Sequence, residues 1–142
     1  MDPDEVTWIT DTVAITNYVS AHSREVLAGH NVKAVLCLDR ELEGCPAAGR
    51  GVASIRVAHL VDGANELSLF KAAVAALESL TQMHGRVVVH HRAGRSRSIA
   101  VVAAYLTRLL GIGADEALDR VRSKRPSAVA PELIRLVEQV EP

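Results

Sequence analysis

Cysteine is scarce in this sequence, which has 142 residues and only two thiols, Cys37 and Cys45. Two cysteines cannot build the disulfide framework of a small secreted domain, and they cannot complete a four-cysteine zinc site. We therefore expect a chain that works in a reducing compartment, with the cytoplasm as its default location.

Long apolar runs and an excess of charge of one sign are also absent. The longest apolar run, residues 99–106, is far shorter than the roughly 18 residues of a membrane span. Residues 1–5 lack the basic and apolar regions of a signal peptide. Sixteen Lys and Arg against 17 Asp and Glu give a net charge of -1, so no global charge attracts nucleic acid or an anionic membrane. We expect no membrane span and no nucleic-acid partner, and any anion must be bound locally.

The composition, with 49% apolar and 23% charged residues, is typical of a folded globular domain, and the length fits one domain over residues 1–142. Short apolar runs predict strands at 6–9, 12–15, 32–38, 54–58 and 86–89, and helical spacing predicts helices at 20–28, 67–84, 98–110, 114–124 and 131–140. Because strands alternate with helices, we predict a single α/β domain with a central, mostly parallel sheet flanked by helices.

Periodicity also predicts which residues of the two longest helices face the core, and glycines predict where helices stop. The predicted stops are Gly29, Gly85 and Gly111. The predicted core positions are Leu67, Phe70, Val74, Leu77, Leu80 and Met83 in the first long helix, and Ile99, Val102, Ala103, Leu106 and Leu110 in the second.

The most informative segment is the polar loop 90–97, which joins a buried strand directly to a helix. Such a loop lies at the carboxyl edge of the sheet, where α/β proteins usually bind ligands. The helix N-terminus offers unpaired backbone N–H groups and a positive dipole, Gly94 allows a tight turn, and Arg97 can present a two-pronged donor. The loop therefore predicts a phosphate cradle. The alternative is an ordinary strand-to-helix turn with solvated arginines.

This segment resembles the signature of the dual-specificity branch of the protein tyrosine phosphatase superfamily. The matching residues are His90, Ala93, Gly94, Ser96, Arg97 and Ser98. The resemblance extends to the order of strands and helices over nearly the whole chain. It implies a dual-specificity phosphatase-like fold and hydrolysis of phosphate monoesters, with no cofactor and no metal.

The resemblance also implies roles for individual residues. The loop residues Arg92, Ala93, Gly94, Arg95, Ser96 and Arg97 would cradle the phosphate, and His90 would support the loop. Ser98 would hydrogen-bond the nucleophile or the leaving group, although capping of the helix explains it equally well. Asp62 lies where the family carries the general acid that protonates the leaving group, but an Asp before a Gly is also a common turn residue.

His91 departs from the family pattern, because it stands where the family carries its nucleophilic cysteine, and neither Cys37 nor Cys45 falls in the signature. Three interpretations follow. The chain can be a phosphatase that uses His91 as its nucleophile, a catalytically inactive pseudophosphatase that binds phosphorylated partners, or a laboratory Cys-to-His variant of an ordinary cysteine-dependent enzyme.

Physical chemistry gives reasons both for and against a nucleophilic role of His91. A neutral imidazole is nucleophilic, and we expect the positive field of the helix end and of Arg97 to lower the pKa of His91 and so favour that form. Asp62 would protonate the departing oxygen, and water would then hydrolyse a phosphohistidine. Against this, the imidazole ring reaches further than a cysteine sulfur, so a cradle built for the shorter side chain can be filled by the ring.

Two features bear on the substrate. Phosphatases of inositol phosphates and phosphoinositides often carry lysine at the positions of Arg92 and Arg95. The resemblance therefore implies a polyphosphorylated small molecule or a lipid head group beside the phosphoprotein substrate of the family. Solvated loop arginines are the alternative. An aromatic content of 3% leaves few rings to stack on phosphotyrosine, which weakly disfavours that substrate.

The histidines His59, His90 and His91 raise the question of a metal site. Adjacent residues of a strand point to opposite faces, so His90 and His91 do not easily bind one ion. No carboxylate or cysteine lies at a recognised ligand spacing, and we predict no metal. We expect His22, His30 and His84 to be surface residues.

Overall fold

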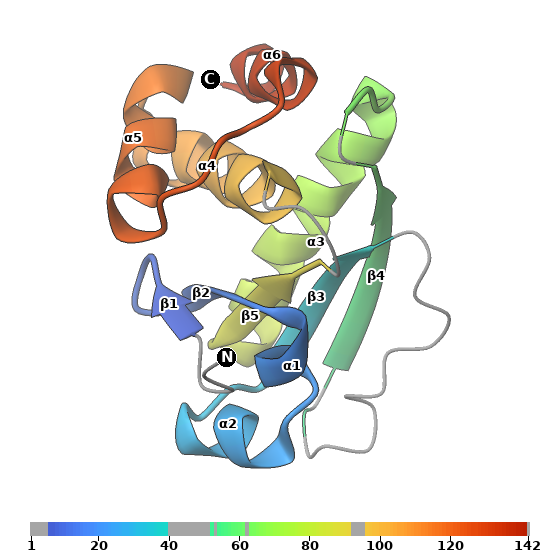
Figure 1. Ribbon diagram of the computed structural model, residues 1–142, viewed down its shortest axis with the longest axis vertical. Helices are drawn as coiled ribbons and strands as arrows, with labels where there is room; N and C mark the ends of the chain where they lie inside the picture. The colour runs from blue at the N-terminus through green and yellow to red at the C-terminus, as the bar shows by residue number, and fades with distance from the viewer. Residues whose placement is uncertain (1–5, 40–51, 53, 62, 92–95, 142) are drawn as a thin grey trace.

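The computed structural model describes residues 6–39, 52, 54–61, 63–91 and 96–141 (Figure 1). Its strands are β1 (Val6–Trp8), β2 (Val13–Thr16), β3 (Ala34–Asp39), β4 (Ser54–Leu60) and β5 (Val87–His90). Its helices are α1 (Tyr18–Ala21), α2 (Arg24–Gly29), α3 (Leu67–His84), α4 (Ser96–Leu110), α5 (Ala114–Lys124) and α6 (Pro131–Val140). Within this part of the chain, no helix is both long enough and apolar enough to cross a membrane.

The five strands form one sheet in the order β1-β2-β5-β3-β4. Neighbouring strands run parallel except β1 and β2, which pair antiparallel as a hairpin with Val6 opposite Thr16. The predicted α/β domain with a mostly parallel sheet is therefore confirmed. Strand β5 lies in the middle, and all four of its residues are buried, which explains why its sequence is almost entirely apolar.

Helices cover both faces of the sheet (Figure 1). On one face, Leu27 of α2 packs with Ala14, Val35 and Val88 of the sheet. On the other face lies the larger core, in which Val87 and Val89 share a cluster with α3, α4, α5 and α6. Because strand residues alternate between faces, the odd- and even-numbered residues of β5 belong to different layers. Because of this alternation, we expect His90 and His91 at the end of β5 to face different layers.

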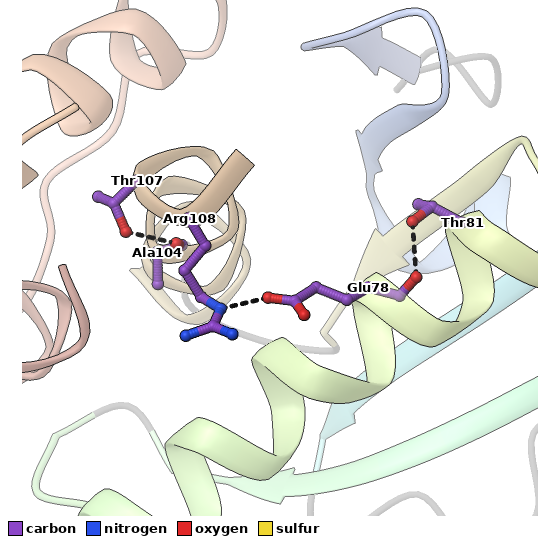
Figure 2. A network of polar contacts seen from close by, with 5 residues as sticks. All are labelled: Glu78, Thr81, Ala104, Thr107 and Arg108. Atoms are coloured by element: carbon purple, nitrogen blue, oxygen red, sulfur yellow. Dashed lines mark hydrogen bonds and ion pairs between the residues drawn. The ribbon is translucent and has the colours of Figure 1, made fainter. Parts of the chain in front are cut away.

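Figure 2 shows polar contacts within and between α3 and α4. Arg108 near the end of α4 forms an ion pair with Glu78 of α3. The buried hydroxyl of Thr107 donates to the carbonyl of Ala104 in its own helix at 2.7 Å, and Thr81 does the same to Glu78 at 2.9 Å. Thr107 therefore satisfies its hydroxyl locally and leaves the packing surface of α4 apolar.

Arg86, which precedes β5, links three segments at the amino edge of the sheet. Its guanidinium carbon lies 3.8 Å from the ring centre of Trp8. Its Nε donates to the carbonyl of His30 at 2.9 Å, and one terminal nitrogen donates to the carbonyl of Asp11 at 3.2 Å. The side chain thereby joins the hairpin and the end of α2 to the start of β5.

The predicted helix 20–28 is wrong in detail, because the chain forms two short helices instead. Ser23 interrupts the helix with an extended backbone, and its hydroxyl accepts from the N–H of Val26 at 3.2 Å as the N-cap of α2. Gly29 is the last residue of α2, and the left-handed residue that redirects the chain is Asn31, with φ of 55°. Asparagine tolerates this conformation better than most residues.

Two predicted core positions are also wrong. Met83 is 70% exposed and Leu110 is 47% exposed, because the last turns of α3 and α4 lie at the surface. Conversely, all residues 99–106 of α4 are buried, so this helix has no solvent-facing stripe there. It packs against α3, α5, α6 and the sheet, and a helix surrounded in this way is apolar all round.

The remaining boundaries agree closely with the sequence predictions. Helices α3, α5 and α6 have the predicted limits, and Gly85 and Gly111 follow their helices with φ of 86° and 67°. Strand β4 extends two residues beyond the predicted end and so includes His59. The predicted loop 39–51 lies almost entirely outside the described residues, as does Cys45.

Candidate active site

The candidate site lies at the carboxyl end of β5, between β2 and β3. His90 is the last residue of β5, His91 follows it, and α4 begins at Ser96. This is the predicted arrangement of buried strand, short loop and helix. Four predicted phosphate-binding residues, Arg92, Ala93, Gly94 and Arg95, lie outside the described residues, as do the side chain of Ser96 and the predicted acid Asp62.

His91 is held by a short hydrogen bond at the start of this loop. Its Nδ1 lies 2.6 Å from Oγ of Ser98, and both side chains are buried, with 9% of His91 and none of Ser98 exposed. Ser98 is the third residue of α4, so it cannot be the N-cap of a helix that begins at Ser96. The capping interpretation of Ser98 therefore fails, and its hydroxyl fixes the imidazole ring.

Arg97 is buried as well, with 7% of the residue exposed. One terminal nitrogen of its guanidinium donates to the backbone carbonyl of Leu60 at 3.0 Å. Leu60 ends β4 and begins the connection that carries position 62. The alternative of a solvated arginine is wrong for Arg97, which connects the start of α4 to the end of β4.

His90 faces the opposite layer from His91. It is fully buried, in register with Cys37 of β3, and its ring lies 5.4 Å from that of His22 and 6.4 Å from that of Tyr18. The ring of His22 in turn lies 4.1 Å from that of Tyr18 at a tilt of 45°, and its Nδ1 donates to the Tyr18 carbonyl at 2.7 Å. The prediction of His22 as a surface residue missed this role in packing the ring of His90.

Cys37 is not an alternative nucleophile for the loop. It is fully buried inside β3, and its register partner is His90 rather than His91. Residues paired across parallel strands point to the same face, so Cys37 belongs to the layer opposite His91. Among the described residues, no group of three His, Cys, Asp or Glu side chains lies close enough to hold a metal ion.

A cavity of about 440 Å³ lies elsewhere, between α3, α4 and the end of α6, lined by residues that include Lys71, Glu78, Arg108 and Glu141. It contains none of the signature residues. Its lining carries two cationic and two anionic side chains, so no excess of positive charge attracts an anion there. The candidate chemistry stays with His91, Arg97 and Ser98.

Comparison with known proteins decides the family. A model of the dual specificity phosphatase catalytic domain matches residues 14–141. The chain belongs to the dual specificity phosphatase family. Dual specificity phosphatase 28 of Mus musculus is 33% identical over 121 residues, covering 84% of this chain and 73% of the mouse protein. The human protein of the same name is 36% identical over 110 residues, covering 77% of this chain and 61% of the human protein.

Solved structures of this phosphatase family agree with the fold. The crystal structure of human dual specificity phosphatase 28 superimposes with a TM-score of 0.82 at 27% identity, covering 99% of this chain and 94% of that one. A mouse putative dual specificity phosphatase complexed with zinc tungstate gives a TM-score of 0.83 at 26% identity, covering 99% and 88%. The dual-specificity phosphatase-like fold is therefore established.

Proposed function

We propose that this domain hydrolyses phosphate monoesters, with His91 in the place of the family's nucleophilic cysteine. The observation that carries this proposal is the 2.6 Å contact between His91 Nδ1 and Ser98 Oγ. A buried imidazole that is hydrogen-bonded through Nδ1 has a restrained ring plane, which favours attack by a nucleophilic histidine.

We assign the two ring nitrogens different tasks. Nδ1 lies 2.6 Å from Ser98 Oγ, and in the tautomer that we propose Nδ1–H donates to this hydroxyl while the lone pair of Nε2 attacks the phosphorus. The P–O bond to the leaving group breaks, and Asp62 transfers its proton to the departing oxygen. Water then attacks the phosphorus of the phosphohistidine, Asp62 takes a proton from that water, and the P–N bond breaks to return neutral His91 and phosphate.

Charge stabilisation comes from the start of α4. Three phosphoryl oxygens carry the developing negative charge in such a transfer, and the enzyme acts mainly by positioning and by electrostatics. We assign this task to Arg97, to the N–H groups of loop 91–97 and to the dipole of α4. Arg97 is held at the start of α4 by the hydrogen bond from one terminal nitrogen to the carbonyl of Leu60, and its planar guanidinium suits the oxygens of a phosphoryl group.

The second candidate function is phosphate recognition without turnover. It is favoured by the burial of His91 and Arg97, which are only 9% and 7% exposed. An imidazole reaches further than a thiolate, and a displacement of about 1 Å can cost on the order of a hundredfold in rate. A pocket partly filled by the ring would hold phosphorylated partners and release them unchanged.

The substrate class that we propose follows from the loop sequence. Arg92, Arg95 and Arg97 place three cationic side chains within six residues, which suits a polyphosphorylated small molecule such as an inositol phosphate or a phosphorylated protein segment. The relative that was crystallised with zinc tungstate supports binding of a tetrahedral oxyanion at this fold.

Turnover of an aryl phosphate separates the two functions. We expect hydrolysis above background in the wild-type chain, loss of it in His91→Asn, and phosphate attached to His91 that is labile in acid and stable in alkali. Full turnover by His91→Asn contradicts nucleophilic catalysis. Tight binding of phosphate or vanadate without any turnover supports the recognition module instead.

The variant His91→Cys tests whether the other residues of the site are arranged for catalysis. If Asp62, Arg97 and the loop are arranged for catalysis, the thiolate restores hydrolysis that is sensitive to thiol reagents. An inactive His91→Cys chain that still folds shows that the fault lies outside position 91.

A further inference from the structure

We propose that Asn65 is a positioning residue for the general acid, because its side chain holds the backbone on both sides of position 62. This inference rests on the proposed function, in which Asp62 protonates the leaving group. Asn65 lies three residues after Asp62 and directly before Glu66, the N-cap of α3.

The side chain of Asn65 makes three hydrogen bonds to the two neighbours of position 62. Its Oδ1 accepts from the N–H of Val61 at 2.8 Å. Its Nδ2 donates to the carbonyl of Val61 at 2.8 Å and to the carbonyl of Gly63 at 3.1 Å. Both backbone groups of Val61 and the carbonyl of Gly63 are therefore bound by one planar amide.

Two further bonds complete the frame around position 62. The N–H of Gly63 donates to the carbonyl of Val61 at 3.0 Å, which closes the turn. The carbonyl of Leu60 accepts from Arg97 at 3.0 Å, which joins the same segment to the phosphate-binding arginine. Arg97 thus holds the backbone at Leu60, and Asn65 holds the backbone at Val61 and Gly63 on either side of position 62.

Among side chains of this length, only that of asparagine can make all three hydrogen bonds together. The arrangement needs one acceptor and two donors on a single rigid group. Aspartate would keep the acceptor for the Val61 N–H but would place carboxylate oxygens against two carbonyl oxygens. Alanine would leave the N–H of Val61 and the carbonyl of Gly63 to water, whereas the carbonyl of Val61 would keep the N–H of Gly63. Val61 is 37% exposed, so water can reach this turn and the fold survives the loss.

A misplaced acid has a specific kinetic signature. Protonation matters when the leaving group is a poor one, such as phenol, and matters little for 2,4-dinitrophenol, which departs as an anion. General acid catalysis contributes about 10²–10⁴-fold in rate. We therefore expect Asn65→Ala to lower kcat on phenyl phosphate by about ten- to a hundredfold, because small displacements of a reacting group are this costly. We expect kcat on 2,4-dinitrophenyl phosphate and KM for both esters to change little.

The experiment compares Asn65→Ala, Asn65→Asp and Asp62→Asn in the wild-type chain and in the His91→Cys chain, on both esters. Thr10→Ala is the matched control, because Thr10 Oγ1 likewise accepts from two backbone N–H groups of a surface turn, those of Thr12 and Val13, at the opposite edge of the sheet. A selective loss on phenyl phosphate in both Asn65 variants, absent in Thr10→Ala and not additive with Asp62→Asn, supports the inference.

The outcomes separate this inference from the proposed function. If the wild-type chain is inactive but His91→Cys shows the selective loss, the histidine chemistry fails and the role of Asn65 stands. If Asn65→Ala lowers kcat equally on the two esters, or leaves both unchanged while Asp62→Asn is selective, the positioning role is overturned. If both backgrounds are inactive, or Asp62→Asn is not selective, there is no acid to position and the inference falls with it.

Discussion

A single hydroxyl distinguishes His91 from an ordinary buried histidine. Ser98 Oγ is fully buried, and Nδ1 of His91 lies 2.6 Å away from it. A histidine at a nucleophile's position has two nitrogens with different reach, and a hydrogen bond at one nitrogen restrains the orientation of the whole ring. Ser98 therefore restrains the orientation of the His91 ring at the start of the loop.

Removing that hydroxyl tests its role at the residue scale. We expect Ser98→Ala to lower kcat of the wild-type chain by about ten- to a hundredfold, since an unrestrained ring is misplaced by a fraction of an ångström or more. The variant also leaves His91 Nδ1 buried without this partner, which costs on the order of 1–3 kcal/mol of unfolding free energy. Steady-state kinetics and urea unfolding measure the two effects.

Thr107→Val is the matched control for Ser98→Ala. It removes another fully buried hydroxyl from α4, but that hydroxyl donates only to the carbonyl of Ala104 in the same helix. We expect it to cost about 1 kcal/mol or less, because the carbonyl keeps its helical bond, and to leave kcat unchanged. Equal kinetic losses in the two variants would contradict a special role for Ser98.

At the scale of elements, α4 carries both the site and the centre of the fold. Its first turn holds Arg97 and Ser98, and residues 99–106 are buried on every side. The helix N-terminus is therefore positioned by packing along its length, so a cradle built on it cannot shift without disturbing α3, α5 and α6. This rigidity is what a site made from backbone N–H groups requires.

The burial of α4 and its helical periodicity make opposite predictions about which of two residues matters more for stability. Val101 is fully buried although it lies outside the predicted inner face, and Leu110 is 47% exposed although it lies on it. We expect Val101→Ala to lower the free energy of unfolding by about 2 kcal/mol through lost burial and a residual cavity. Leu110→Ala should change it by less than about 0.5 kcal/mol. Urea denaturation followed by circular dichroism measures both, and equal effects would contradict the burial of α4.

The limits of sequence-based prediction follow from what periodicity records. The bounds of α3, α5 and α6 were predictable because a glycine or a proline punctuates each of them. The exposure of Met83 was not predictable, because the apolar pattern of a helix does not show how far along the helix the neighbouring elements cover it. At the site, Arg97 and Ser98 could be predicted from the signature, whereas the contact of Arg97 with Leu60 involves a backbone carbonyl, which leaves no trace in the sequence.

Asn65 and His22 are two further residues whose contacts could not be predicted from the sequence. Asn65 had a local signal, since an asparagine shortly after Asp-Gly is typical of a turn, but its three bonds depend on the path of the chain. His22 lies 68 residues from His90 in sequence and meets it only because α1 packs over β5. Neither contact follows from composition or spacing alone.

At the scale of the whole molecule, the amino edge of the sheet is held independently of the site. Arg86 binds the carbonyls of His30 and Asp11 and lies over Trp8, so it joins the hairpin, α2 and β5. These contacts lie at the start of β5, whereas His91 follows its end. The contacts of Arg86 therefore lie at the edge of the sheet opposite the candidate site.

We expect Arg86→Ala to lower the free energy of unfolding by about 1–3 kcal/mol, because it removes charged hydrogen bonds and a cation–π contact. Arg86→Lys keeps the charge over Trp8 but cannot donate to both carbonyls from a rigid fork, so an intermediate loss is expected. Thermal unfolding by circular dichroism gives the ranking, and kcat of both variants should match the wild type. A large loss of kcat in Arg86→Lys would contradict the separation of the two edges.

Trp8 is the only tryptophan of the chain, and it stacks beneath Arg86 at this distant edge. Its fluorescence is therefore a probe of the hairpin and not of the cradle. Titration with phosphate should leave the emission unaltered even when binding is tight, so a silent spectrum is no sign of an empty site. Placing a tryptophan at Val61, beside position 62, would give the chain an optical signal that responds to its ligand.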